Sequence, residues 1–351
     1  MSTNVKNSPC PARRRDRPVR LSHPLAMLSI ALLAASPAWT GDPAAKSAAA
    51  VEKHAVLWTA PQDIAGRDLF YGPGGQQGQP RPPFQFVKEE REGTNPKFVV
   101  SDANGVKWKA KLGLEAASET AASRIVWGIG YYASEDYFLR EMKVAGMPAH
   151  LHRGDNLVGP AGTVHNVRLK REPEGDKKVG QWRWNGSAVT GAREWNGLRV
   201  LMAVINNWDL KDMNNAVYRR DKEDIFMVSD LGATFGSAGL KWPLNRSRNN
   251  IDSYAKSKFI RRVHRDTVDF QTPARPAIVF LVAPKQYFGR IRMERLGRDI
   301  PRADAKWLGE LLAKLSPAQI RDAFRAGGYS PQEIDAFSRI LTSRIAALGD
   351  L

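Results

Sequence analysis

A single cysteine occurs among the 351 residues, and it stands at position 10. Beyond the first 38 residues the chain can therefore form no disulfide bond, and it offers no thiol nucleophile or cysteine-ligated metal site. Without cross-links, the fold must be held together by the packing of apolar side chains. Hydrophobic residues make up 42% of the sequence, which is ample for one or two domains with a real core.

The amino-terminal region lacks a hydrophobic run long enough to span a membrane. Residues 25–35 form an apolar run of 11 residues, whereas a transmembrane helix needs about 20. The basic residues 13–20 precede this run, and the short stretch 36–38 follows it as a cleavage site. This order is typical of a signal peptide. We expect cleavage near Ala38 and an exported protein, periplasmic or secreted, with no transmembrane span in the mature chain.

Acidic residues are scarce relative to basic ones, since 36 Asp and Glu face 53 Lys and Arg, a net charge of +17. This excess favours anionic partners such as nucleotides, phosphorylated polymers or lipid head groups. A solvated basic surface would give the same balance. The basic residues 241–265 could grip an acidic substrate or phosphates. The chain has no recognisable nucleic-acid-binding motif, so nucleic acid is the less favoured partner.

Two familiar kinds of site are incomplete. The Gly-rich stretch 71–78 lacks the preceding strand and the following Lys-Ser/Thr of a P-loop, so we interpret it as a structural turn. His150 and His152 would share one face of a strand, and His165 follows, but no carboxylate or fourth ligand stands at a recognisable spacing. The sequence therefore gives little support for a histidine metal site.

Three β-strands are predicted at the start of the folded region, at residues 84–88, 97–101 and 106–112. Turn-forming residues 93–96 and 102–105 separate them, and the second turn carries Asn-Gly in the position favoured in hairpins. Further strands are predicted at 164–170, 181–184 and 277–282, the first two separated by the charged turn 172–178. Residues 131–147 give no clear assignment.

The third predicted strand carries three lysines on one face, because Lys107, Lys109 and Lys111 alternate with apolar residues. A solvated strand face is the ordinary explanation of such a pattern. The alternative is that one lysine points into a cleft. For that position we favour Lys111, where Leu-Gly ends the strand, and Lys109 is the second candidate.

A helix is predicted over residues 116–129, with an apolar stripe that includes Ala122 and Ile125. Glu119 stands at the edge of that stripe, where it could pair with a strand lysine. A glutamate in the first turn also simply favours the helix dipole. Glu115 is the alternative acidic partner.

The most informative pattern lies within residues 205–236. A helix predicted over 190–206 has an amphipathic apolar stripe and leads into Asp209-Leu-Lys211-x-x-Asn214. A polar turn, in which Asp and Asn act as caps, would also explain these residues. The spacing nevertheless suits a loop in which a carboxylate accepts a proton and an amide holds a divalent metal.

A second motif follows the apolar run 225–229, which we predict to be a strand. Here Asp230-Leu-Gly232 places another carboxylate at the end of the strand. Two such loops facing each other would form a site for a metal-bound nucleotide.

The two motifs together resemble the catalytic loop D-x-x-x-x-N and the metal-binding loop D-F-G of protein kinases. No His-Arg precedes Asp209, and no Ala-Pro-Glu follows Gly232. The chain therefore resembles atypical members of the protein-kinase-like superfamily, such as bacterial persistence-toxin kinases and secreted Golgi kinases, more than eukaryotic protein kinases.

The resemblance implies a chemical role for each loop residue. Asp209 would orient and deprotonate a hydroxyl acceptor, and Lys211 would neutralise charge on the transferred phosphoryl group. Asn214 and Asp230 would hold magnesium that bridges the phosphates.

The resemblance also implies how the nucleotide is held. Lys111, or alternatively Lys109, would grip the phosphates of ATP or another nucleotide, and Glu119 would orient that lysine. Catalysis of this kind depends on positioning and electrostatics, so it needs no covalent nucleophile.

The expected architecture is α+β with two lobes, a small antiparallel β lobe with one helix and a larger, mostly helical carboxyl-terminal lobe. The expected parts are a signal peptide (1–38), a mobile lead-in with a Gly/Pro-rich loop (39–83), the small nucleotide-covering lobe with insertions (84–184) and the large lobe (185–351). Ser316-Pro317 and Ser330-Pro331 each start a predicted helix with a capping box. These last helices would complete the large lobe or form a separate docking bundle.

The expected activity is that of an exported, kinase-like phosphotransferase. It would move a phosphoryl group from a nucleotide–magnesium complex to a hydroxyl acceptor on a protein or an anionic envelope polymer. The alternative is a non-catalytic, pseudokinase-like protein that binds an anionic partner in the cell envelope. A structural envelope protein with an incidental polar loop is a third, lower-ranked interpretation.

Overall fold

The alternation of apolar and charged residues along strand β4, Lys107–Leu112, gives this strand two different faces. Trp108, Ala110 and Leu112 are buried in the apolar core of the small lobe. The three lysines lie on the opposite face, as predicted from the sequence. Of these, Lys111 is also buried, because helix α2, Glu115–Gly128, contacts the strand.

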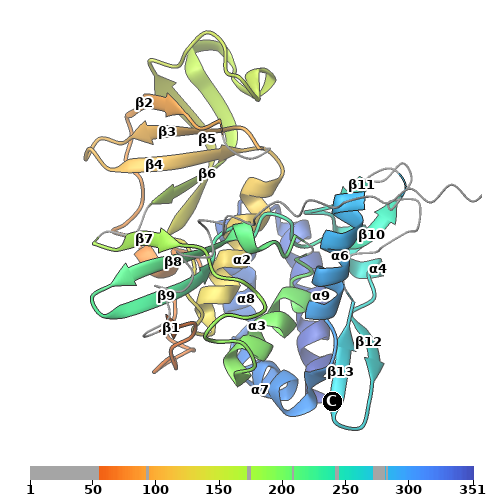
Figure 1. Cartoon of the computed structure of the whole chain (residues 1–351). Helices are drawn as coiled ribbons and strands as arrows, with labels where there is room; N and C mark the ends of the chain where they lie inside the picture. Colours follow the sequence, from red (N-terminus) through yellow and green to blue (C-terminus); the bar gives the residue numbers. More distant parts are fainter. Residues whose placement is uncertain are drawn as a thin grey trace, which may run out of the picture. The chain divides into compact units, whose positions relative to one another are not determined.

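The computed structural model describes residues 55–91, 95–171, 175–207, 209–241, 245–271, 281 and 284–351. All of them belong to one compact unit, Asp42–Leu351. Its architecture is α+β and has the two lobes expected from the sequence. Figure 1 shows the β-strands of the small lobe at one end and the helices of the larger lobe at the other.

The small lobe is a closed five-stranded barrel in the order β2-β3-β4-β6-β5. Its strands besides β4 are β2 (Phe84–Glu89), β3 (Lys97–Ser101), β5 (Asp136–Ala145) and β6 (Thr163–Arg171). The neighbours pair in antiparallel fashion except β2 and β5, whose parallel pairing closes the barrel. Residues 131–147, which have no clear sequence signal, thus supply the long strand β5.

The turn between β3 and β4 has the hairpin chemistry expected from its Asn-Gly pair. Gly105 adopts a left-handed φ of 76°, which a glycine tolerates without steric cost. The Asp102 carboxylate accepts hydrogen bonds from the backbone N–H groups of Asn104 and Val106 and from the Trp108 indole. These bonds tie the turn to the barrel core.

A four-stranded sheet of order β1-β9-β8-β7 belongs to the larger lobe. Its strands are β1 (Ala55–Val56), β7 (Lys177–Gly180), β8 (Asn215–Arg220) and β9 (Glu223–Val228). From the sequence, the larger lobe is expected to begin at residue 185. Two strands of this sheet, β1 and β7, nevertheless come from the chain before that residue. The apolar residues Leu57, Ile64 and Leu69 are also buried in the core of this lobe, so the chain packs from residue 55 onward.

The strand predicted at residues 181–184 does not form. The strand in this part of the chain is β7, which ends at Gly180. Trp182 and Trp184 instead pack edge to face, with ring centroids 4.9 Å apart, in the core of the larger lobe. The Trp182 indole N–H donates to the backbone oxygen of Met227, and the Trp184 backbone N–H donates to the Asp212 carboxylate. These bonds take the place of a strand ladder.

Helices make up most of the remainder. They are α3 (Arg193–Val204), α4 (Ile251–Lys256), α6 (Pro284–Leu296), α7 (Arg302–Ala313), α8 (Pro317–Ala326) and α9 (Pro331–Gly349). Short strands complete the lobe: β10 (Ser237–Lys241), β11 (Asn245–Ser247), β12 (Ile260–Val263), β13 (Thr267–Phe270) and β14 (Ile300–Pro301). Apart from residue 281, the strand predicted at 277–282 lies outside the described residues.

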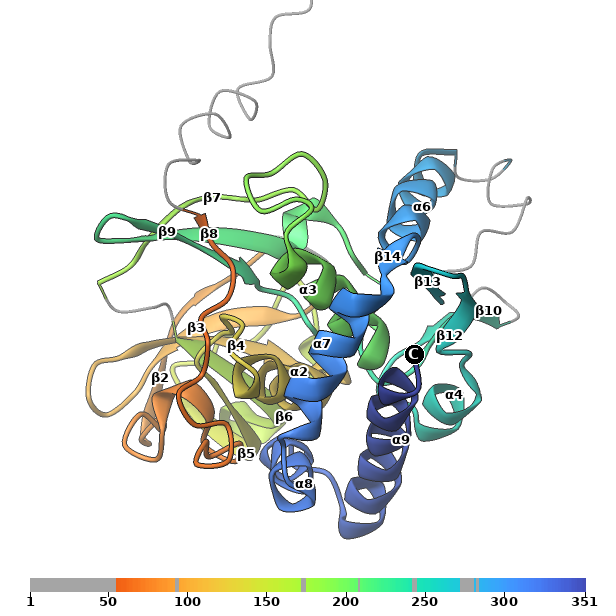
Figure 2. The same cartoon turned by 90° about the horizontal axis from the view of Figure 1, so that it is seen from below.

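The carboxyl-terminal helices share one apolar core with α2 and α3, so they complete the larger lobe and are not a separate bundle. Helix α7 packs against both α3 and α9 (Figure 2). Phe235, which follows the Asp230 motif, is fully buried and contacts the rings of Phe324 and Phe337. Burial of a phenylalanine contributes about 1.5–3 kcal/mol, so this cluster anchors the segment after Gly232. In the described part of the chain, no helix combines the length and apolarity needed to cross a membrane.

The capping boxes predicted before α8 and α9 are confirmed. The Ser330 hydroxyl accepts from the backbone N–H of Glu333, and the Ser330 backbone N–H donates to the Glu333 carboxylate. Ser316 and Gln319 form the same pair before α8. Each box satisfies backbone N–H groups that the first turn of a helix leaves without partners.

We expect Ser330→Ala to lower the free energy of unfolding by about 1 kcal/mol, because one N-terminal N–H of α9 loses its acceptor. Urea denaturation would measure this loss. Ser343→Ala is the matched control, since Ser343 is exposed further along the same helix and should leave the free energy nearly unchanged. Equal losses in the two variants would contradict the capping role.

Candidate functional site

Lys111 brings together the small lobe, helix α2 and the Asp230 motif. Its ammonium nitrogen lies 2.7 Å from Glu115 Oε2, 2.8 Å from Glu119 Oε2 and 3.2 Å from Asp230 Oδ1. A lysine has three N–H donors, so each carboxylate matches one donor. Of the two lysines considered from the sequence, Lys111 is the one that contacts Asp230. Lys109 is half-buried on the same face of β4.

The electrostatics of this contact keep Lys111 and Asp230 charged. Burial by itself lowers the pKa of Lys111, but the surrounding carboxylates hold that pKa well above its ordinary value. Burial tends to raise the pKa of Asp230, yet the charge of Lys111 and the Gly232 backbone N–H lower it to about 2. The Asp230 side chain keeps 38% of its surface exposed, so it still faces solvent.

Gly232 permits this close approach. A Cβ at this position would lie 2.7 Å from Glu115 Oε2 and 2.9 Å from Lys111 Nζ, closer than such atoms can pack. The Ser118 hydroxyl, on α2, donates to the Gly232 backbone oxygen at 2.8 Å. The glycine of the motif is thus needed because α2 and Lys111 press against the backbone there.

The loop that carries Asp209 is organised by its own side chains. The Asn214 amide donates to the Asp209 backbone oxygen at 2.6 Å and to Asp209 Oδ2 at 3.2 Å. Lys211 Nζ lies 2.8 Å from Asp209 Oδ1. The Asn207 side chain accepts from the Asp209 backbone N–H at 3.0 Å. Asp209, Lys211 and Asn214 therefore lie together, around the single-turn helix Asp212–Asn214.

Backbone hydrogen bonds hold the two motifs side by side. The backbone oxygen of Asn214 accepts from the N–H groups of Ser229, at 2.8 Å, and Asp230, at 3.2 Å. The Ser229 hydroxyl donates to the same oxygen at 3.0 Å. The loop that begins at Asp209 thus contacts the chain just after β9, at Ser229 and Asp230.

The side chains of the two motifs include oxygen atoms of the kind that a divalent metal binds. Asn214 uses its amide nitrogen within the loop, and Asn214 Oδ1 accepts no hydrogen bond from the described residues. Asp230 presents a partly exposed carboxylate on the adjacent loop. Magnesium prefers one or two carboxylates together with neutral oxygen ligands and water, and these two side chains offer such oxygens.

Lys111 and its three carboxylate partners, Glu115, Glu119 and Asp230, form a group that we call the Lys111 cluster. Two arginines contact this cluster, and the sequence around them did not predict this role. Arg168, on β6, lies 3.3 Å from Glu119 Oε1. Arg248, beyond β11, forms an ion pair with Glu115 Oε1. From the sequence, Arg248 belongs only to the basic segment 241–265. Strand pairing explains the place of Arg168, because Lys111 and Arg168 face each other in the β4–β6 register.

The other sequence candidates lie apart from this cluster. His150 pairs with Asp155 and His165 lies 3.8 Å from Glu141, and no metal-binding group of three His, Cys, Asp or Glu occurs within the described ranges. The Gly-rich stretch 71–78 is held as a turn, with the Tyr137 hydroxyl donating to the Gly75 backbone oxygen.

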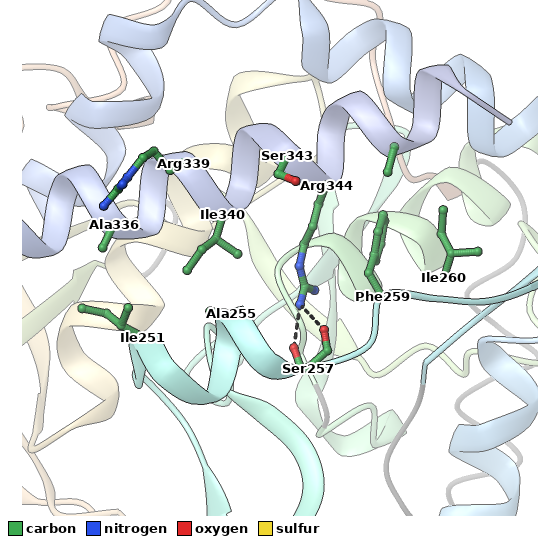
Figure 3. A pocket seen from close by; sticks show the side chains of 11 residues that line it. Ile251, Ala255, Ser257, Phe259, Ile260, Ala336, Arg339, Ile340, Ser343 and Arg344 are labelled. Atoms are coloured by element: carbon green, nitrogen blue, oxygen red, sulfur yellow. Dashed lines mark hydrogen bonds between the residues drawn. The ribbon is translucent and has the colours of Figure 1, made fainter.

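A cavity of about 600 Å³ lies between α4 and α9 (Figure 3) and is lined by none of the site residues above. Apolar residues such as Ile251, Phe259 and Ile340 form much of its wall. Its buried arginine, Arg344, already donates to the Ser257 hydroxyl and backbone oxygen. Much of the cavity wall is therefore apolar, and its buried arginine is already paired.

Comparison with known proteins finds no matching protein-family model and no matching curated protein. Among solved structures, the Helicobacter pylori proinflammatory kinase CtkA is 11% identical, over 77% of this chain and 97% of that one, with a TM-score of 0.44. Two crystal structures of the Golgi casein kinase, one with Mn/ADP bound, are 12% and 13% identical. They cover 77% of this chain and 73% of theirs, with TM-scores of 0.33 and 0.35. At this level of similarity, function must be inferred from the site itself.

The pKa of Asp230 predicts an acid-sensitive contribution to stability. Because its folded pKa lies below the ordinary value of 3.8, at about 2, the Lys111–Asp230 pair stabilises the fold above the unfolded pKa. This contribution is lost as the pH falls from about 4 to about 2. Urea denaturation across this range should show a smaller loss of stability in Asp230→Asn than in the wild type. Asp266→Asn, at an exposed turn, should follow the wild type, and parallel curves for all three proteins would refute the assignment.

Proposed function

We propose that the protein is an exported, atypical kinase-like phosphotransferase, which moves a phosphoryl group from a nucleotide–magnesium complex to a hydroxyl acceptor. The observation that supports this most is the meeting of Lys111, Glu119 and Asp230 beside the loop from Asp209 to Asn214. Two candidate metal ligands and a candidate base thus lie in adjacent loops, and a cation for phosphate contacts one of these loops from strand β4.

Lys111 is the residue proposed to grip the nucleotide phosphates. It stays protonated, and Glu119 on α2 holds its ammonium at 2.8 Å. Its third contact, with Asp230, is the longest of the three at 3.2 Å. A phosphate oxygen could therefore replace that contact without disturbing the bonds to α2.

Asp209 is the proposed base for the acceptor hydroxyl, and Lys211 is proposed to neutralise charge on the transferred group. The loop bonds from Asn214 fix the orientation of the Asp209 carboxylate. Lys211 contacts Asp209 and is about half exposed, so it can follow an incoming phosphoryl group. Such a mechanism depends on positioned charges and requires no covalent intermediate.

Asn214 and Asp230 are the proposed metal ligands, through Asn214 Oδ1 and the Asp230 carboxylate. Magnesium held there would neutralise negative charge that develops on the phosphates. Export is proposed from residues 1–38 alone, which lie outside the described residues. The acceptor is proposed to be a hydroxyl-bearing protein or an anionic envelope polymer.

We expect magnesium and ATP together to raise the melting temperature of the wild type, and Asp230→Ala to abolish this shift because a metal ligand is lost. Asp209→Ala should retain the shift yet lower phosphoryl transfer by about 10²–10⁴-fold, the usual contribution of a general base. Differential scanning fluorimetry and a radiolabelled phosphate assay would measure the two effects.

The control for these variants is Glu310→Ala, since Glu310 is exposed on α7 and should change neither the shift nor the transfer. The proposal fails if no nucleotide shifts the wild-type melting temperature in the presence of magnesium. It also fails if Asp230→Ala binds the nucleotide as tightly as the wild type.

A second function is favoured by one observation, the exposed cations on and around β12. Lys258, Arg262 and Arg265 are exposed and form no ion pair with any described residue. A non-catalytic, pseudokinase-like protein could bind an anionic partner in the cell envelope through this surface, without using the nucleotide site.

Under this second function, inorganic polyphosphate should bind the Asp209→Ala/Asp230→Ala double variant as tightly as the wild type. The affinity should fall steeply with salt, because exposed charges are screened. Arg262→Gln/Arg265→Gln should weaken binding, as measured by titration calorimetry at several ionic strengths. Loss of binding in the double aspartate variant would instead assign the anion to the nucleotide site.

A further inference from the structure

The Lys111 cluster poses an electrostatic problem for phosphate binding. Three carboxylates, those of Glu115, Glu119 and Asp230, lie within 3.2 Å of a single ammonium group. By themselves these four groups carry an excess of negative charge, which would repel the phosphates of a nucleotide. Like charges a few ångströms apart repel strongly where water is excluded, so other cations must compensate the carboxylates.

Glu119 has a second cation in Arg168. One carboxylate oxygen of Glu119 contacts Lys111, and the other lies 3.3 Å from Arg168 Nη1. The Arg168 side chain is only 4% exposed. Its Nε and Nη1 make no hydrogen bond with the described residues, so the contact acts through charge. Arg168 therefore meets the oxygen of Glu119 that does not contact Lys111.

Glu115 has its own second cation in Arg248. Glu115 Oε2 contacts Lys111, and Glu115 Oε1 accepts from Arg248 Nη1. Arg248 follows the Asp230 motif in the chain, and its side chain is 38% exposed. The two glutamates of α2 are thus each shared between Lys111 and one arginine.

Asp230 differs from both glutamates. Within ion-pair distance it meets only Lys111 among the described residues. Its remaining contact is with the Gly232 backbone N–H. Of the three carboxylates, it is the one with no arginine within ion-pair distance among the described residues, and it is the one that the proposed function assigns to the metal.

We propose that Arg168 and Arg248 are positioning residues that neutralise Glu119 and Glu115, and that they thereby leave the charge of Lys111 available for nucleotide phosphate and the Asp230 carboxylate available for a divalent metal. This inference rests on the proposed function. It assigns one arginine to each of the two glutamates, in addition to the shared Lys111, and none to Asp230.

Arg248 offers the sharper test because it is partly exposed, so its replacement disturbs folding least. Arg248→Met should weaken magnesium–ADP binding about tenfold, since Glu115 then adds uncompensated negative charge beside the phosphates. In the same background, Glu115→Gln should restore the affinity, because the surplus charge is removed. A merely structural role for Arg248 predicts the reverse, a further loss when a second contact is deleted.

Arg261→Met provides the matched control. Arg261 is 44% exposed and lies 3.3 Å from Glu294, so it resembles Arg248 in exposure and pairing but lies outside the cluster. It should bind magnesium–ADP like the wild type. Arg168→Lys keeps the positive charge and should retain the affinity for magnesium–ADP. Arg168→Met removes this charge and should lower that affinity.

Calorimetric titration with magnesium–ADP separates the possible outcomes. If the wild type binds and Arg248→Met binds equally well, or if Glu115→Gln fails to restore binding, the inference is overturned while the proposed function stands. If the wild type does not bind magnesium–ADP, the proposed function and this inference fall together. Weakened binding in Arg248→Met that Glu115→Gln restores supports the inference.

Discussion

The buried ammonium group of Lys111 is the contact on which the rest of the site depends. A buried lysine without partners would lose its charge, because taking an ammonium out of water is costly. Two glutamates from α2 and one aspartate from the loop after β9 prevent this. The same contact fastens a barrel strand, a helix and a loop of the larger lobe to one point. Anything that moves α2 or the Asp230 loop must therefore alter the environment of Lys111.

The larger lobe supplies the stiffness that this contact needs. Phe235 lies in an aromatic core with Phe324 and Phe337, so the chain just beyond the Asp230 motif is anchored. The Asn214 backbone oxygen ties the Asp209 loop to the start of the same motif. Apolar packing thus holds the polar loops in place, while the Lys211 side chain, paired with Asp209, stays about half exposed to solvent.

Much of the fold could be predicted from short-range patterns. The alternation in β4, the Asn-Gly turn and the capping boxes of α8 and α9 each depend on residues a few positions apart, so the sequence displays them directly. The strand predicted at 181–184 shows where this fails. Alternating tryptophans look like a strand face, but both side chains enter the core, and the Trp182 backbone oxygen accepts from the Asn215 side chain instead of from a strand backbone. Pairing partners of that kind lie far away in the chain and leave no local signal.

The sequence by itself determined the order of the charged motifs, the apolar stripes of the helices and the starts of α8 and α9, because these depend on neighbouring residues. The tertiary structure alone decided that Lys111 meets Asp230, 119 positions away, and that Arg248 meets Glu115, 133 positions away. It also placed Arg168 opposite Lys111 through strand register. The reason is physical, since charge compensation acts through space, and only the folded chain brings these groups within a few ångströms of each other.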